Sequence, residues 1–147
     1  MAEVDRTQLH ILWFEETNKK DVALVGGKNA SLGEMTVSGI PVPPGFSVTS
    51  FAYRAFLDET GLSEKIYSSL EKIDVADTAK LEALSNRIRE AIESADVSMK
   101  ISNEVTKAYR KLCDRTIPNV AVAVRSSATA EDLPGASFAG QQETSST

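Results

Sequence analysis

The sequence predicts an α/β (α+β) domain in which a small mixed sheet is covered by several helices. Short apolar runs of strand length recur along the chain, and three later segments carry apolar residues at helical spacing. The chain has 147 residues, of which 41% are hydrophobic and 25% charged, as in an ordinary globular domain. We therefore expect one domain with a core of its own.

The first part of the chain is expected to pair short apolar runs with one helix. Residues 9–14 predict a first strand, and residues 22–25 form a second apolar run that the glycines at 26–27 close with a sharp turn. A helix is expected to open at Lys28 and to stop at Gly39.

The next segment is rich in proline and cannot be helical. Three prolines within residues 40–45 fix the backbone and remove amide donors, which predicts an extended connection. A strand at residues 46–48 follows, and then a helix at residues 51–58 that Thr49 or Ser50 caps.

The middle of the chain predicts three amphipathic helices. Their apolar faces span residues 62–73, 81–95 and 101–112, and their other faces are charged and polar. We expect these helices to cover one side of the sheet. A buried strand is expected at residues 120–124.

That strand ends at Arg125, and a loop of small residues follows. A cation at the end of a buried strand, beside a loop that lets backbone amides approach, is typical of an anion site in α/β proteins. An ammonium at the helix start at Lys28 opposes the helix dipole, and a bound anion would neutralise both positive features. The residues therefore suggest a polyphosphate site.

Two structural alternatives stay open: Arg125 pairs with a carboxylate, or Lys28 is a solvated surface lysine. The Walker pattern is not met, because Val22 and Asn29 stand at two of its fixed positions.

Two long motifs carry a family resemblance. Residues 122–144 (VAVRSSATAEDLPGASFAGQQET) and residues 25–46 (VGGKNASLGEM followed by GIPVPPGF) resemble the nucleotide-binding domain of the phosphoenolpyruvate synthases, or pyruvate, water dikinases. The resemblance implies that residues 1–147 are the N-terminal lobe of an ATP-grasp-like domain. It also implies that the phosphohistidine and pyruvate-binding domains of such enzymes are absent from this chain. A strand is expected after residues 141–144, where the chain stops.

The resemblance also implies roles for four residues. Lys28 resembles the lysine that contacts the ATP phosphates, and Arg125 resembles the strand-end arginine that holds them. Gly140 resembles the close-approach position of the phosphate-covering loop, and Thr144 a nucleotide-contacting residue after it. No catalytic residue and no metal ligand is assigned to this chain, and Mg²⁺ is expected to be held by acids outside it. The adjacent acids at 131–132 could be mistaken for metal ligands, but in a turn such acids are usually solvated or cap a helix.

The implied function is ATP binding within an enzyme that converts ATP, pyruvate and water to AMP, phosphoenolpyruvate and phosphate through a phosphohistidine. The isolated chain is expected to be inactive, and pyruvate is expected to bind only through the absent domains. A rifampicin phosphotransferase shares this lobe and remains an alternative, as does a nucleotide-binding module without catalysis. Pyruvate, phosphate dikinase fits less well, because its equivalent loop reads differently.

Composition excludes several other classes. The net charge of −5 with no basic run argues against nucleic-acid binding. No apolar run approaches the roughly 20 residues of a membrane span, and the N-terminus is unlike a signal peptide, so we expect a cytoplasmic protein. The single cysteine, Cys113, is expected to be a packed core thiol, and the single histidine, His10, a packing or surface residue.

Overall fold

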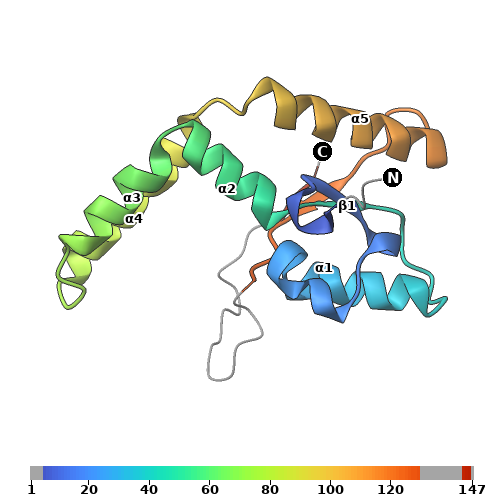
Figure 1. Ribbon diagram of the computed structural model, residues 1–147, viewed down its shortest axis with the longest axis horizontal. Coiled ribbons are helices and arrows are strands. Elements are labelled where there is room, and N and C mark those ends of the chain that lie inside the picture. The colour runs from blue at the N-terminus through green and yellow to red at the C-terminus, as the bar shows by residue number, and fades with distance from the viewer. Residues whose placement is uncertain (1–4, 130–143, 147) are drawn as a thin grey trace.

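The computed structural model describes residues 5–129 and 144–146. Within these residues, the chain forms helices and two small antiparallel sheets, and four of the helices follow one another between β2 and β3 (Figure 1). The helices and strands are, in chain order, β1 (Ile11–Trp13), α1 (Val22–Val37), β2 (Phe46–Val48), α2 (Ser50–Glu59), α3 (Leu62–Glu71), α4 (Thr78–Ser94), α5 (Met99–Arg115), β3 (Ala123–Arg125) and β4 (Thr144–Ser146). Single 3₁₀ turns lie at Arg6–Gln8, Phe14–Glu16 and Lys19–Asp21.

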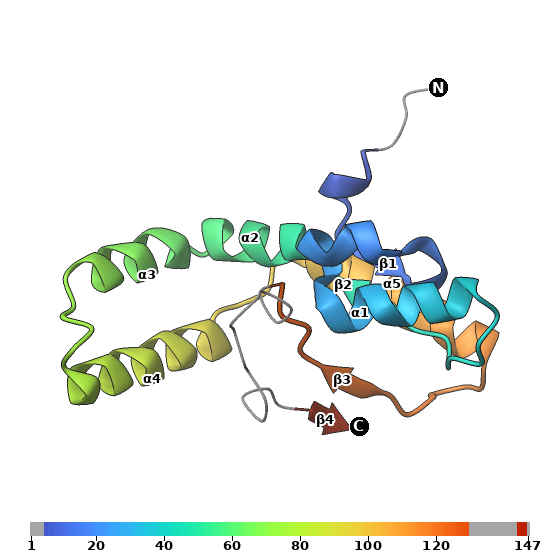
Figure 2. The ribbon, with the colours of Figure 1, turned by 90° about the horizontal axis from the view of Figure 1, so that it is seen from below.

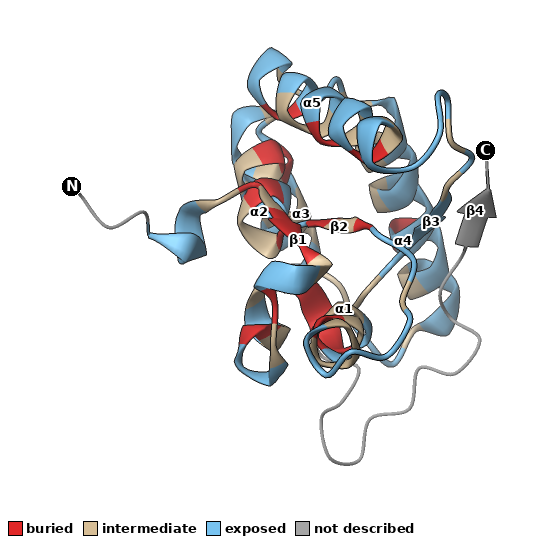
Figure 3. Ribbon diagram, turned by 90° about the vertical axis from the view of Figure 1, so that its right-hand side faces the viewer, coloured by how far each residue is buried: buried red, intermediate tan, exposed pale blue. Residues whose placement is uncertain are grey.

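The β1–β2 pair lies at the centre of the fold. Side chains alternate across a strand, so neighbouring residues of β1 enter two different cores. Leu12 is fully buried against Ala30 of α1, whereas Trp13 packs against Ala108 and Leu112 of α5. Figure 3 shows α1 and α5 on opposite sides of the buried strands. This packing fixes the position of α1 relative to the β1–β2 pair.

Several predicted elements are confirmed. The strand at residues 46–48 is β2, and the three amphipathic helices are α3, α4 and α5. Thr49 is the cap of α2: its Oγ1 accepts the N–H of Ala52 at 3.2 Å and donates to the carbonyl of Leu9 at 2.6 Å. The same hydroxyl therefore starts the helix and ties it to the chain that enters β1. The first strand is shorter than the predicted run, because the chain turns into a 3₁₀ helix at Phe14.

The expected mixed sheet is wrong. The pairs β1–β2 and β3–β4 are separate, and both are antiparallel within the described residues. The segment before β3 is attached to α5 by side chains instead of by a ladder: Val120 and Val122 pack against the Trp13 cluster. The hydroxyl of Tyr109 donates to the carbonyl of Val120 at 2.9 Å, which occupies a group that a sheet would otherwise use.

The strand before Arg125 is also not buried as expected. The residues of β3 are exposed, and 60% of the Val124 surface is accessible. Among the described residues its ladder partner is β4, where Arg125 lies opposite Thr144. A strand therefore does occur at the end of the chain, where one was expected.

The middle helices do not all cover a sheet. Of the three middle helices, α5 packs against β1, whereas α3 and α4 project as an arm (Figures 1 and 2). Other helices cover the apolar base of the arm: Leu62 of α3 packs in one cluster with Phe56 of α2 and Ile101 of α5. Amphipathic periodicity predicts an apolar face but not which neighbour covers it.

The single histidine and the single cysteine lie on the α5 side of the fold. His10 is buried, stacks on Phe51 with ring centroids 5.4 Å apart, and has Nδ1 2.8 Å from a carboxylate oxygen of Glu104. It is a packing residue, as expected. Cys113 is half-buried on α5, so it is less enclosed than a core thiol. No helix of the described residues is long and apolar enough to cross a bilayer.

Candidate functional site

The start of the candidate site is a break within α1. Residues 22–25, expected only as an apolar run, form a helical turn, and Gly26 then interrupts the helix with φ 76° and ψ 165°. The helix resumes at Gly27, so a new helix N-terminus lies next to Lys28. The first amides of such a helix segment have no partner within it and carry partial positive charge.

The loop after Arg125 packs against this break. The amide of Gly27 donates to the carbonyl of Ala128 at 3.4 Å, and the amide of Asn29 donates to Oγ of Ser127 at 3.3 Å. A Cβ built on Gly26 would lie 2.3 Å from both the carbonyl oxygen and Oγ of Ser127. Two features therefore require glycine at position 26: the positive φ and the close approach of the loop.

This contact brings the two predicted cations to one cleft. Lys28 and Arg125 both line a cleft of about 400 Å³. The other lining residues are Gly27, Asn29, Ser31, Leu32, Met35 and Ser126. The helix that starts at Gly27 supplies one wall, and the end of β3 supplies the other. The structure therefore places Lys28 and Arg125 on one cleft.

The electrostatics of the cleft favour an anion. Its described lining contains two cations and no carboxylate. The positive end of the main α1 segment adds to the field of these side chains. A multiply charged anion such as a polyphosphate would complement the charge of both side chains and of the helix end.

The other two predicted residues are placed only in part. Gly140 lies outside the described residues, as do the acids at 131–132. Thr144 is described through its backbone, which pairs with Arg125 in the β3–β4 ladder. The ladder therefore brings the segment after the small-residue loop next to the strand-end arginine.

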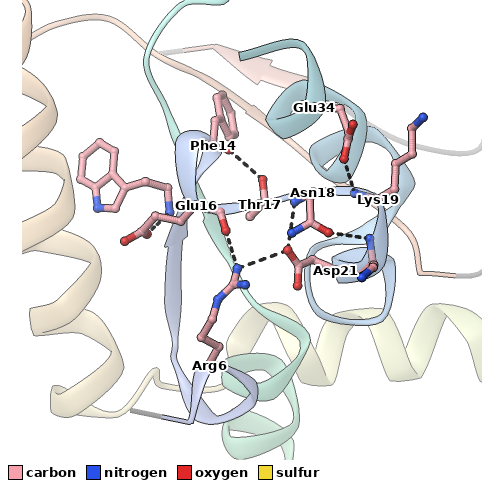
Figure 4. Close-up of polar contacts among 10 residues, drawn as sticks. Arg6, Phe14, Glu16, Thr17, Asn18, Lys19, Asp21 and Glu34 are labelled. Atoms are coloured by element: carbon pink, nitrogen blue, oxygen red, sulfur yellow. Dashed lines mark hydrogen bonds and ion pairs between the residues drawn. The ribbon is translucent and has the colours of Figure 1, made fainter. Parts of the chain in front are cut away.

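A second close approach holds α1 against the chain that leaves β1. A Cβ built on Gly33 would lie 2.1 Å from Oγ1 of Thr17 and 2.4 Å from its carbonyl oxygen. Thr17 is 1% exposed, and its hydroxyl donates to the carbonyl of Phe14 at 2.9 Å (Figure 4). This glycine lets the helix lie directly on the backbone of residue 17.

Polar side chains complete this support (Figure 4). The carboxylate of Asp21 accepts the amide of Asn18 at 2.9 Å and a guanidinium N–H of Arg6 at 3.2 Å. The carboxylate of Glu34, on α1, accepts the amide of Lys19 at 2.9 Å. The segment before α1 is thus held at both ends, which fixes where the helix begins.

Sequence reasoning missed three supporting residues: Ser127, Thr17 and Gly33. Ser127 stands in the quoted loop motif, but no spacing rule relates it to a helix so distant in the chain. Gly33 carries a weak signal, because a glycine inside a helix costs about 1 kcal/mol against alanine and so suggests a packing reason.

Comparison with known proteins agrees with the motif resemblance. Residues 22–145 match the family described as pyruvate phosphate dikinase, AMP/ATP-binding domain. The probable phosphoenolpyruvate synthase of Archaeoglobus fulgidus is 55% identical over 134 residues, which cover 91% of this chain and 18% of that protein. The phosphoenolpyruvate synthase of Neisseria meningitidis serogroup B is 50% identical over 140 residues, covering 92% of this chain and 18% of the relative. That of Pyrococcus furiosus is 44% identical over 167 aligned positions, with 91% and 20% covered. The chain spans about a fifth of the length of these relatives.

Proposed function

The chain belongs to the pyruvate phosphate dikinase AMP/ATP-binding domain family, and from that premise we propose that the cleft between Lys28 and Arg125 grips the phosphates of ATP. The observation that carries this proposal is the convergence of the two cations on one cleft at the start of a helix segment. ATP carries its negative charge on the phosphates, so a site of this kind would bind that end of the nucleotide.

The two cations would act differently. The guanidinium of Arg125 offers a planar set of donors that can bind two phosphate oxygens at once, whereas the ammonium of Lys28 acts as a compact point charge. The hydrogen bond between Ser127 and the amide of Asn29 would keep the two walls at the right separation. Ser127 is thus a positioning residue in this proposal. Gly140 and Thr144 would continue the cover over the phosphates, as the resemblance implies.

The whole enzyme would be a phosphotransferase of the phosphoenolpyruvate synthase type. Such an enzyme converts ATP, pyruvate and water to AMP, phosphoenolpyruvate and phosphate, with the phosphoryl group carried on a histidine. We assign only the ATP-binding step to this chain, and we assign the carrier histidine and the pyruvate site to other parts of a longer protein. The chain by itself would then bind nucleotide without turnover. Positioning and charge neutralisation supply most of the catalysis in phosphoryl transfer, so this lobe would still set the rate of the first step.

Magnesium does not fit the described lining alone. Mg²⁺ prefers carboxylate, phosphate and water oxygens. The described lining of the cleft has no carboxylate, and no group of three or more His, Cys, Asp or Glu in the described residues could hold a metal. We therefore propose that the protein ligands of the ion lie outside this chain.

Calorimetric titration of the chain with ATP and with adenosine tests the proposal. We expect ATP to bind at least about ten times more tightly, because the cations of the cleft contact phosphates, which adenosine lacks. Equal affinities, or no binding of ATP, would contradict it. In the longer enzyme, AMP release that requires pyruvate would support the synthase assignment, whereas a requirement for rifampicin would assign the alternative acceptor.

A further inference from the structure

The arm formed by α3 and α4 carries a groove away from the Lys28–Arg125 cleft. The two helices lie side by side and are joined by the turn at residues 72–77 (Figure 2). The groove between them has a volume of about 560 Å³. None of its lining residues lines the candidate nucleotide cleft.

The floor of the groove is an apolar seam. Leu62 and Ile66 of α3 lie four positions apart, and Leu84, Ile88 and Ala91 of α4 follow a spacing of four and three. These spacings place each set on one face of its helix. Ile73 lines the groove from the turn that follows α3. Leu62 and Leu84 are buried, but the other four are only half-buried. Two helices that both turn an apolar stripe to the same groove form an incomplete bundle, which a third helix would complete.

The rim of the groove is positive. Lys65, Lys72, Lys80 and Arg87 line it, against one acid, Asp74. Lys80 pairs with the neighbouring Asp77 at 3.1 Å. Within the part of the chain that the structure describes, the other three cations make no ion pair. This local excess is opposite in sign to the net charge of −5 of the whole chain.

We propose that this groove docks an acidic amphipathic α-helix of a partner protein. The apolar stripe of the incoming helix would cover the seam, and its acidic flanks would face the basic rim. The groove-lining residues of α4 run from Lys80 to Ala91, which is about 16 Å or about three helical turns. A groove of that length, with a helix on each side, fits an α-helix better than a compact anion. The inference is independent of nucleotide binding.

The test uses two fluorescent peptides of about four helical turns. Both carry the same leucine stripe. One peptide has glutamate at all the remaining positions, and the other has lysine at those positions. We expect the acidic peptide to bind the chain saturably in fluorescence anisotropy, at least about tenfold more tightly than the basic peptide. Failure of the acidic peptide to bind, or equal binding of both peptides, overturns the proposal.

A charge-reversed variant tests the location. Lys72→Glu with Arg87→Glu should weaken the acidic peptide at least about tenfold and strengthen the basic one, a gain that loss of folding cannot produce. The matched control is Arg89→Glu with Lys107→Glu, which changes the net charge equally at exposed positions that do not line the groove. Equal effects of the two double variants would show general electrostatics and overturn the assignment.

Two further measurements test two other occupants of the groove. Sodium laurate that binds the groove where the acidic peptide does not would assign it to an anionic amphiphile. Self-association in sedimentation equilibrium that the double variant of residues 72 and 87 abolishes would assign it to a second copy. Either result replaces the proposed partner.

Discussion

The Oγ atom of Ser127 lies 3.3 Å from the amide nitrogen of Asn29, and this contact joins the loop after β3 to the helix segment that begins behind Gly26. It connects two motifs that lie at opposite ends of the chain. Lys28 belongs to one of them and Arg125 to the other, so the contact lies beside the cleft that both cations line.

Gly26→Ala should disrupt this junction. The new Cβ would face the backbone and Oγ of Ser127 at 2.3 Å, at a φ of 76° that alanine rarely adopts. The free energy of unfolding in urea should fall by about 3 kcal/mol. Gly39→Ala is the matched control, because Gly39 has a φ of 79° and no atom within 4 Å of the built Cβ. It should cost only about 1 kcal/mol. Equal losses in the two variants would show that the loop does not press on Gly26.

Ser127→Ala should affect binding more than stability. It removes the acceptor of the Asn29 amide but leaves both cations of the cleft in place. We expect the affinity for ATP to fall about three- to tenfold because the cleft is less preorganised, with a change in unfolding free energy of at most about 1 kcal/mol. Ser85→Ala on the exposed surface of α4 is the control and should change neither. An unchanged ATP affinity in the Ser127 variant would remove its positioning role.

Gly33→Ala should reverse the usual effect of this substitution in a helix. At an open helical site alanine stabilises by about 1 kcal/mol over glycine. Here the added Cβ would meet Thr17 at 2.1 Å, so we expect the free energy of unfolding to fall by about 2 kcal/mol or more. Ser31→Ala, at an exposed position of the same helix, should be neutral or slightly stabilising. A stabilised Gly33 variant would mean that the helix does not lie on Thr17.

Glu15 should give a weak dependence of stability on pH. Its carboxylate accepts from the guanidinium of Arg115 at 2.6 Å, and that guanidinium lies 4.0 Å from the ring centre of Trp13. Burial raises the pKa of Glu15, but hydrogen bonds from its own backbone and from Arg115, with the charge of Lys111, bring the pKa below its ordinary 4.5.

The sign of this effect follows from the lowered pKa. The folded state favours the carboxylate, so the stabilisation is complete above pH 4.5 and is lost as the pH falls through the lower folded pKa. Because the pair is partly exposed, Glu15→Gln should lower the unfolding free energy at pH 7 by only about 0.5 kcal/mol, a difference that disappears in acid. Tryptophan fluorescence during urea unfolding measures it. A difference that grows on acidification would contradict the pairing.

The sequence was sufficient where local chemistry decides the structure. The strand at residues 46–48 follows from the prolines before it, and the cap at Thr49 from its hydroxyl. It was not sufficient at two places. β1 ends early because the carboxylate of Glu16 accepts the amide of Trp13 at 2.8 Å and a 3₁₀ turn begins there, a cap that the apolar run hides. The carbonyl of Val120 accepts the hydroxyl of Tyr109, a contact between a helix and the chain that follows it, for which the sequence has no spacing rule.

The candidate site divides in the same way. Lys28 and Arg125 could be predicted, because each stands at the end of an element beside small residues. The contact of Ser127 with Asn29 could not, because it depends on how the loop lies against the helix in three dimensions. The projection of α3 and α4 was equally hidden, since their apolar faces fit either a sheet or other helices.

The affinity of the chain for ATP, measured by calorimetry in Lys28→Ala and Arg125→Ala, tests the central claim most directly. Each substitution should weaken binding at least about tenfold, because each removes one of the two cations that line the cleft. Lys20→Ala, at an exposed residue outside the cleft, should change the affinity by less than about twofold. Wild-type affinity in either cleft variant, with the fold intact, would contradict the proposal that both residues grip one triphosphate.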